Sequence, residues 1–426
     1  MADNSHTCSL ADIRGVHRAF VIVLLAFLAG FGPLCTDMYL PALPDIAKDM
    51  SIPATMAQAS IAACLLGLAL GQIVIGHISD GIGRKGILLA SLAVFTGASI
   101  LCAHASTGES FLLLRFLQGL GGSGGTVLCR ALSCDSFTGS RLTSFMSMFM
   151  AITGIAPVIG PLGGGFFTST LGWRSIFYLL AGIGLLLLLG CRLAIPETLS
   201  PQKRVRGGMM ASFKNMGKLF HYRAFLWYTG VQGFTAAGFF CYISASPFIF
   251  LNIYGFSVEQ FSLFFGTNAM VLVLSSFVVG QLSGRFGDKA LLAFGNYCRA
   301  LACLAILAVA ILQPSSPLPM MVSLMTMLAA QGLTKPTSFT LAIMAQSAGA
   351  GAASGILGVA FFVCGAAASP LAGIAGPQSA LPLGIMSAFS GMGALVCTLL
   401  GNRALTLASD KPSEARDLLR GELDRS

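Results

Sequence analysis

The chain has 426 residues, of which 55% are hydrophobic and 10% are charged, and its mean hydropathy is +0.82. A soluble domain does not carry this composition, whereas a bundle of membrane-spanning helices does. The net charge of +9 could suggest a nucleic-acid partner, but the basic residues gather on one side of the predicted spans, which is the pattern of a membrane protein, so we expect no nucleic-acid binding.

Apolar runs of spanning length recur along the whole chain, and we count twelve of them. They cover residues 19–40, 54–76, 86–104, 109–130, 142–167, 173–194, 223–249, 258–283, 289–312, 318–344, 352–375 and 380–403. The fold class predicted is an all-α membrane protein with twelve transmembrane helices in two six-helix bundles. The first run is too long for the core of a cleaved signal, so we expect it to be retained.

The polar segments between these runs predict the domain organisation and the orientation. We expect a tail (1–18), a bundle (19–194), a linker (195–222), a second bundle (223–403) and a tail (404–426). With this assignment 20 of the 25 Lys and Arg fall on one side, and Lys48 and Arg174 fall on the other. Basic loops mark the cytoplasmic side, so both termini are predicted to be cytoplasmic in a bacterial inner membrane.

Asp37 is the only acid that we place beyond the first two positions of any predicted span; Glu109 and Glu259 stand at the beginning of theirs. A carboxylate in a bilayer is costly, and it is usually functional and faces an internal cavity. Arg115, well inside the fourth run, must likewise face a cavity or an acid. We interpret the two as a proton site, in which a proton relieves the buried charge of Asp37 while a nearby guanidinium favours the carboxylate. An inert pair is the structural alternative.

The two halves carry a weak internal repeat. The run from Gly76 to Lys85 (GHISDGIGRK) aligns with the run from Gly280 to Lys289 (GQLSGRFGDK), and each joins the second span of its half to the third. Gly76 and Gly83 allow a tight turn there. Internal repetition of this kind is typical of transporters, whose substrate site lies between the halves near mid-membrane.

At this loop the chain resembles the major facilitator superfamily. The resemblance implies a conformational latch, in which Asp80 bridges to the start of span 11 and Arg84 contacts Asp135, with Lys85 anchoring the loop. In the second copy Gly284 and Asp288 replace the acid and the arginine, so a latch there would be weaker.

Span 5 carries closely spaced glycines and prolines, which favour close helix contact and a bend. The motif residues are Gly154, Pro157, Gly160, Pro161, Gly163 and Gly164. This run resembles the antiporter signature of the superfamily's export branches, which implies export.

Together with Arg115, the span-1 run from Thr36 to Pro44 (TDMYLPALP) resembles the Bcr/CflA group of bacterial drug exporters, named for bicyclomycin and chloramphenicol resistance. The region Leu28-Ala29-Gly30 lacks the second span-1 acid that related exporters carry.

Several polar residues in the central spans are candidates for lining a substrate cavity. They are Tyr39, Gln58, Gln118, Gln232, Tyr242, Asn268 and Lys335. Lys335 and Arg299 can also reach the cytoplasmic side by snorkelling, which is our interpretation for Arg299 and remains open for Lys335. If Lys335 reaches the cavity, we expect neutral, zwitterionic or anionic cargo.

Three other functions were weighed. A nucleotide-driven pump would need G-x-x-x-x-G-K-[ST], which does not occur, and the scattered His and the missing G-x-S-x-G argue against an enzyme. The cysteines lack C-x-x-C spacing, so neither a metal nor another cofactor is expected.

From the motifs and the resemblance together we predict a monomeric, proton-coupled exporter of small drug-like molecules (chloramphenicol, bicyclomycin or sulfonamide types). The alternative is an exporter or symporter of an endogenous peptide or amino acid.

Overall fold

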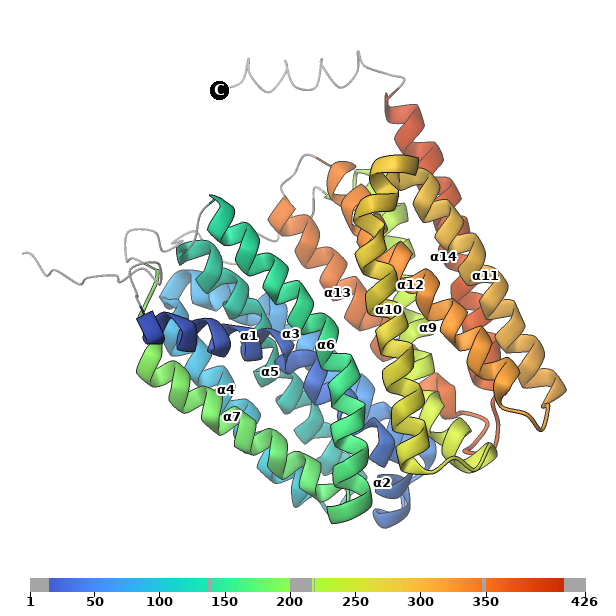
Figure 1. Ribbon diagram of the computed structural model, residues 1–426, viewed down its shortest axis with the longest axis horizontal. Coiled ribbons are helices and arrows are strands. Elements are labelled where there is room, and N and C mark those ends of the chain that lie inside the picture. Colours follow the sequence, from blue (N-terminus) through green and yellow to red (C-terminus); the bar gives the residue numbers. More distant parts are fainter. Residues whose placement is uncertain (1–14, 137–138, 200–216, 218, 347–349, 410–426) are drawn as a thin grey trace, which may run out of the picture.

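The computed structural model describes residues 15–136, 139–199, 217, 219–346 and 350–409, and the regular structure within these residues is entirely helical. The first six long helices are α1 (Gly15–Asp37), α3 (Ala54–Ile82), α4 (Arg84–Ala103), α5 (Gly108–Ser136), α6 (Gly139–Leu171) and α7 (Arg174–Ala194). The second six are α9 (Arg223–Pro247), α10 (Val258–Phe286), α11 (Asp288–Leu312), α12 (Leu318–Met344), α13 (Ala350–Ala368) and α14 (Leu381–Ser409). These two sets form two bundles that lie side by side (Figure 1).

Short helical pieces extend three of the long helices. They are η2 (Leu40–Ala42) and α2 (Leu43–Asp49) after α1, η4 (Phe248–Ile253) after α9, and η5 (Pro370–Gly373) after α13. We call the end of the molecule that carries α2 the α2 end. The opposite end, where α7 leads into residues 195–222, is called the linker end.

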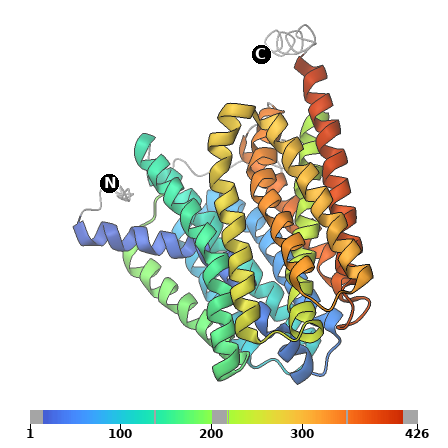
Figure 2. The same cartoon turned by 45° about the vertical axis from the view of Figure 1, so that its right-hand side comes forward.

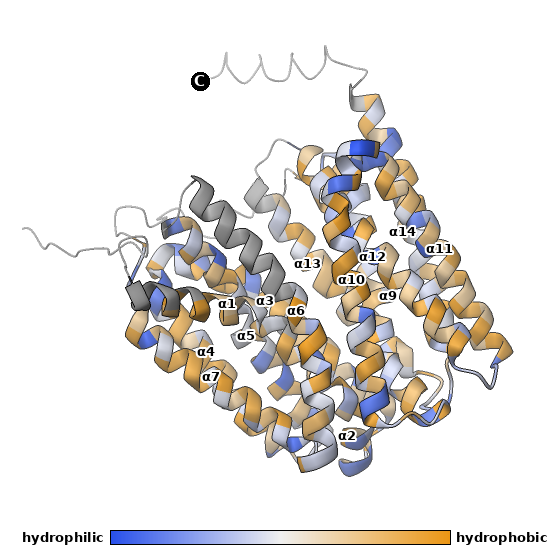
Figure 3. Ribbon diagram, viewed as in Figure 1, coloured by the Kyte–Doolittle hydropathy of each residue, from blue (hydrophilic) through white to orange (hydrophobic). Residues whose placement is uncertain are grey.

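Hydrophobic residues make up much of the ribbon of both bundles (Figure 3), and many large apolar side chains are exposed. Leu186, Leu193 and Leu312 expose 71%, 83% and 78% of their surface, and such a surface suits a bilayer better than water. Within the described residues eight helices are individually long and apolar enough to cross a membrane, or nine if the bent first pair is one span. The long helices α1, α5, α6 and α12 are not among these eight and complete the set of twelve.

The first span is broken. Its parts Val23–Gly32 and Leu34–Asp49 are bent by 44°, which places Asp37 beside the bend.

The two copies of the repeat form equivalent one-residue turns, because Gly83 and Gly287 adopt φ values of 131° and 78°, a region that favours glycine.

The bundles contact each other mainly through α6 with α10 and α3 with α13. At the α2 end the Gln58 amide donates to the backbone carbonyl of Ser244 at 3.2 Å. From this end the ribbons diverge toward the linker end (Figures 1 and 2). Most of the predicted linker (residues 200–216 and 218) and most of both predicted tails lie outside the described residues, although Leu219 is buried against the second bundle.

Candidate functional site

Asp37 is the last residue of α1 and lies inside the protein, with 6% of its surface exposed. The Thr36 hydroxyl donates a hydrogen bond to Asp37 Oδ1 at 3.1 Å. On α6, a Cβ atom added at Gly160 would lie 3.3 Å from Asp37 Cβ. The carboxyl group is therefore held at the contact between the first and fifth helices and faces neither lipid nor the ends of the molecule.

Arg115 of α5 is fully buried and organises a polar cluster in the first bundle. It donates to Gln118 Oε1 and, at 3.2 Å, to the Cys35 carbonyl of α1. The guanidinium carbon lies 4.0 Å from the centre of the Tyr39 ring, and Gln118 donates in turn to Ser99 Oγ of α4 at 2.7 Å. We call these residues the arginine site. It joins the first, third and fourth helices of the bundle.

Asp37 and Arg115 are neighbours without forming an ion pair. The ion pairs of the described residues include neither of them. Arg115 instead reaches α1 through the Cys35 carbonyl, two residues before Asp37, in a last helical turn whose carbonyls lack donors within the helix. Any movement of α1 relative to α5 would therefore change how strongly the guanidinium favours the ionised carboxylate.

The six residues of the predicted antiporter motif all lie within α6: Gly154, Pro157, Gly160, Pro161, Gly163 and Gly164. A Cβ added at Gly164 would collide with the Met38 carbonyl, and one at Gly163 would lie 3.4 Å from Met38 Cε. Further along the helix, a Cβ at Gly154 would lie 3.3 Å from Val273 of α10. The glycines of the motif thus let α6 pack closely between the Asp37–Met38 segment and the second bundle.

The candidate cavity residues separate into two groups. Tyr39 and Gln118 are fully buried in the arginine site, so the prediction that they line a cavity does not hold in this conformation. The reason is that Arg115 needs an aromatic face and an acceptor, and both side chains turn toward it. Gln58 is also buried, at the contact between the bundles.

The other candidates belong to the second bundle and face its inner helices. Asn268 donates to the Tyr242 hydroxyl at 2.9 Å, and both residues are about 1% exposed. Gln232 donates to the Lys335 carbonyl at 2.8 Å. Lys335 is exposed, and its Nζ lies 4.2 Å from the centre of the Phe361 ring.

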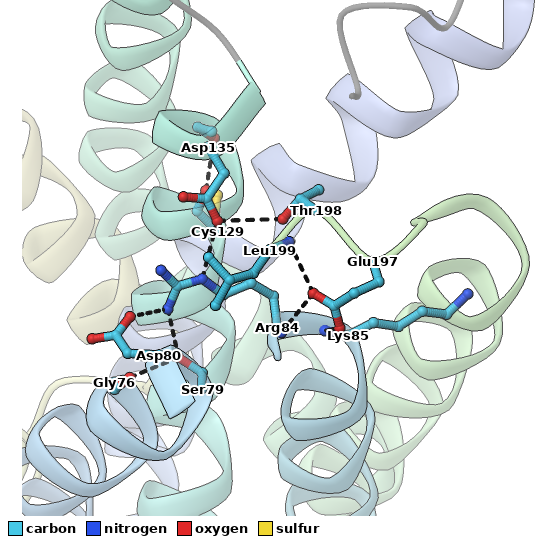
Figure 4. Close-up of polar contacts among 11 residues, drawn as sticks. Gly76, Ser79, Asp80, Arg84, Lys85, Cys129, Asp135, Glu197, Thr198 and Leu199 are labelled. Carbon is cyan, nitrogen blue, oxygen red and sulfur yellow. Dashed lines mark hydrogen bonds and ion pairs between the residues drawn. The ribbon is translucent and has the colours of Figure 1, made fainter. Parts of the chain in front are cut away.

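The loop between α3 and α4 forms a charged network at the linker end (Figure 4). Arg84 Nε donates to Asp135 Oδ2 at 3.1 Å, and Arg84 Nη1 contacts Asp80 and, at 2.7 Å, Ser79 Oγ. The other predicted contact, from Asp80 to the start of span 11, falls at the beginning of α13, where the side chains of residues 350–352 lie outside the described part of the chain. Among the described residues the Asp80 carboxylate, near the end of α3, binds Arg84 at the start of α4.

Glu197 is a member of this network that the sequence did not predict, since no motif marks it and it follows shortly after α7. The Glu197 carboxylate accepts from the backbone N–H groups of Arg84 and Lys85 at 2.9 and 3.1 Å (Figure 4). These are the first residues of α4, so the carboxylate caps a helix N-terminus, where donors are unpaired and the helix dipole favours negative charge.

Arg299 contradicts our interpretation that it snorkels. It is fully buried in the second bundle, where it donates to Gln331 of α12 and, at 3.1 Å, to the Thr235 carbonyl of α9. These two acceptors hold the terminal nitrogens of the guanidinium inside the bundle, so the side chain does not extend to the membrane surface.

Comparison with known proteins agrees with this architecture. The Major Facilitator Superfamily profile matches residues 20–370, and the chain therefore belongs to this family of membrane transporters. It is similar to the uncharacterized MFS-type transporter YdgK of Bacillus subtilis (37% identity, 88% of this chain and 93% of the relative). It is also similar to the bicyclomycin resistance protein homolog of Haemophilus influenzae (30% identity, 64% of this chain and 69% of the relative). Multidrug resistance protein MdtL of Salmonella heidelberg is 29% identical over 64% of this chain and 67% of the relative.

These relatives place the chain in the Bcr/CflA group of the superfamily, as a multi-pass bacterial membrane protein and a transporter, not an enzyme. The fold also matches solved structures. A bacterial homolog of the lysosomal transporter Spinster, in an inward-facing unoccupied conformation, gives a TM-score of 0.72 at 16% identity, over 93% of this chain and 98% of that one. The D-xylose–proton symporter gives 0.66 at 14% identity, over 88% and 96%. Both support the fold alone.

Proposed function

We propose that this chain is a proton-driven exporter of small drug-like molecules, of the chloramphenicol, bicyclomycin or sulfonamide type, in the bacterial inner membrane. The linker end and both termini face the cytoplasm, and the cargo passes through a cavity between the two bundles. The protein works as a monomer and uses the proton gradient without a cofactor. The names of the bicyclomycin and multidrug resistance relatives support drugs as the cargo.

One observation carries the coupling proposal: the buried Asp37 carboxyl lies beside a helix break and next to the arginine site. Burial favours a protonated, neutral carboxyl, whereas a closer guanidinium favours the ionised form. When α1 moves relative to α5, Asp37 takes up or releases a proton. Each tenfold change in proton affinity supplies about 1.4 kcal/mol to the conformational change.

Helix α6 provides the mechanical connection in this proposal. It packs on Met38 through Gly164 and on α10 of the second bundle through Gly154. A rocking motion of the second bundle therefore reaches the segment that carries Asp37. The Arg84 network at the linker end would form and break as the cytoplasmic side closes and opens.

Substitution of Asp37 by Asn tests the proposal. The purified full-length chain is reconstituted in proteoliposomes that contain a pH-sensitive dye, and proton release is followed after addition of chloramphenicol, bicyclomycin, a sulfonamide or a dipeptide. We expect drug-induced proton release from the wild type and from a matched control, Asp45→Asn, which changes an exposed acid of α2. We expect none from Asp37→Asn.

Unchanged proton release from Asp37→Asn would refute the assignment of the proton site. A response of the wild type to the dipeptide, with none to the drugs, would instead identify a metabolite carrier.

A further inference from the structure

Lys335 has no anionic partner in the described chain. It lies well inside α12, yet its side chain is exposed, and the ion pairs and hydrogen bonds of the described residues do not include its ammonium group. The group lies 4.2 Å from the centre of the Phe361 ring, which is a favourable cation–π distance. A cation within a membrane span is costly unless something compensates it.

The backbone that presents this lysine is fixed by three hydrogen bonds. Gln232 of α9 donates to the Lys335 carbonyl at 2.8 Å and to Ser338 Oγ at 2.9 Å, and Ser276 of α10 donates to the Gly332 carbonyl at 3.1 Å. Gln232 is 3% exposed, so these bonds are shielded from water. Hydrogen bonds among three helices of the second bundle therefore fix the backbone at Lys335, so the position of this lysine is set by the fold.

Lys335 lies on the side of α12 that meets α13, because its Nζ lies beside the Phe361 ring of α13. Helix α13 in turn packs against α3 of the first bundle. The ammonium group therefore lies near the contact between the two bundles and has an aromatic ring beside it, whereas Asp37 lies at the end of α1 toward the α2 end.

We propose that Lys335 and Phe361 form a recognition site for cargo that carries a carboxylate or similar anionic group on an apolar or aromatic body. The anion pairs with Lys335, and the apolar body lies against Phe361. This proposal rests on the proposed export function and narrows its substrate class. Neutral drugs still bind, through apolar contacts alone.

The test uses a matched pair of probes, radiolabelled chloramphenicol, which is neutral, and its hemisuccinate ester, which carries one carboxylate. Equilibrium binding is measured with the full chain in phosphatidylcholine nanodiscs, where the lipid has no net negative charge. For Lys335→Gln we expect hemisuccinate binding to weaken about tenfold, because a charge-assisted hydrogen bond is lost. Chloramphenicol binding should change by less than about twofold.

Two further variants separate charge from folding. Lys335→Arg keeps the cation and should retain hemisuccinate binding, and Lys289→Gln removes a lysine near the linker end that donates to Thr406 at 3.2 Å and should bind both probes like the wild type. The inference is overturned if the wild type does not bind the hemisuccinate. It is also overturned if Lys335→Gln binds this ester as tightly as the wild type or loses both probes equally.

The same samples distinguish this inference from the proposed function. Asp37→Asn should bind the hemisuccinate like the wild type and yet release no protons. If the wild type binds the hemisuccinate through Lys335 without proton release, the anion site stands and proton-coupled export fails.

Discussion

Each bundle contains a buried arginine that contacts a glutamine of its fourth helix and a backbone carbonyl of its first helix. In the first bundle Arg115 binds Gln118 and the Cys35 carbonyl. In the second, Arg299 binds Gln331 and the Thr235 carbonyl. The fourth helices even share the order Gln-Gly-Leu at 118–120 and 331–333.

The two arrangements differ in what lies beside the carbonyl. Two residues after Cys35 is Asp37, whereas two residues after Thr235 is Ala237. The arginine also comes from a different helix, α5 in the first bundle and α11 in the second. The arginine and the glutamine thus join helices within a bundle even where no acid lies beside them. Coupling chemistry requires the acid as well, and only in the first bundle does an acid follow the carbonyl that the buried arginine contacts.

The largest expected effect separates the two arginines. Arg115→Gln should abolish drug-induced proton release, because the group that responds to movement of α1 is gone. Arg299→Gln should leave the protons released per drug unchanged and lower the melting temperature by several degrees, since it leaves the buried Gln331 acceptor unpaired at a cost of about 1–3 kcal/mol. Proton release in proteoliposomes and thermal unfolding measure the two outcomes. Equal loss of proton release in both variants would break the comparison.

The fifth helices give the next largest effect. Gly164→Ala in α6 places a methyl group on the Met38 carbonyl, a backbone atom that cannot yield easily. Overpacking of this kind costs about 1–3 kcal/mol, so we expect transport to fall at least about tenfold. In Gly358→Ala of α13 the new Cβ lies 2.9 Å from Gln72 Oε1, the end of a flexible side chain, and transport should stay near the wild-type rate. Transport assays that rank the two variants in the opposite order would contradict this account.

The two loop copies predict a smaller effect. Arg84→Gln removes the contacts to Asp80 and Asp135, and we expect the transport rate to fall several-fold. Asp288→Asn changes a residue that the Ser283 hydroxyl contacts, and an amide oxygen can still accept that bond. Initial rates of drug uptake into inverted vesicles measure both. A larger loss in Asp288→Asn would place the latch in the second bundle.

The smallest effect concerns the α2 end of the first bundle. Hydrogen bonds from Arg174 at 2.5 Å and Trp173 at 3.1 Å lower the pKa of Asp49 below its usual value. A lowered folded-state pKa means that the stabilisation is present at neutral pH and is lost as the pH falls through that value. The pair is exposed, so Asp49→Asn should lower the melting temperature by about 2 °C or less at pH 7. The difference from the wild type should vanish on acidification.

The sequence predicted the spans because hydropathy is a local signal. The contact of Arg84 with Asp135 joins residues 51 positions apart, and it was predicted from the resemblance of the loop to the major facilitator superfamily. The sequence did not predict which way Arg299 points, because the rotation of α11 depends on acceptors at Gln331 and Thr235, far along the chain. The Glu197 cap was missed for a similar reason, since it depends on how the chain folds back after α7.

The way in which the bundles meet at the α2 end has an energetic consequence. The ion pairs of the described residues all lie within the first bundle, and the bundles are joined there by the neutral bond from Gln58 to the Ser244 carbonyl. Such a bond contributes about 1 kcal/mol, comparable with a tenfold change in affinity for a single proton. Under the proposed coupling, binding or loss of one hydrogen ion therefore changes the free energy by about as much as this polar contact does, while the packing of α6 on α10 and of α3 on α13 keeps the bundles together.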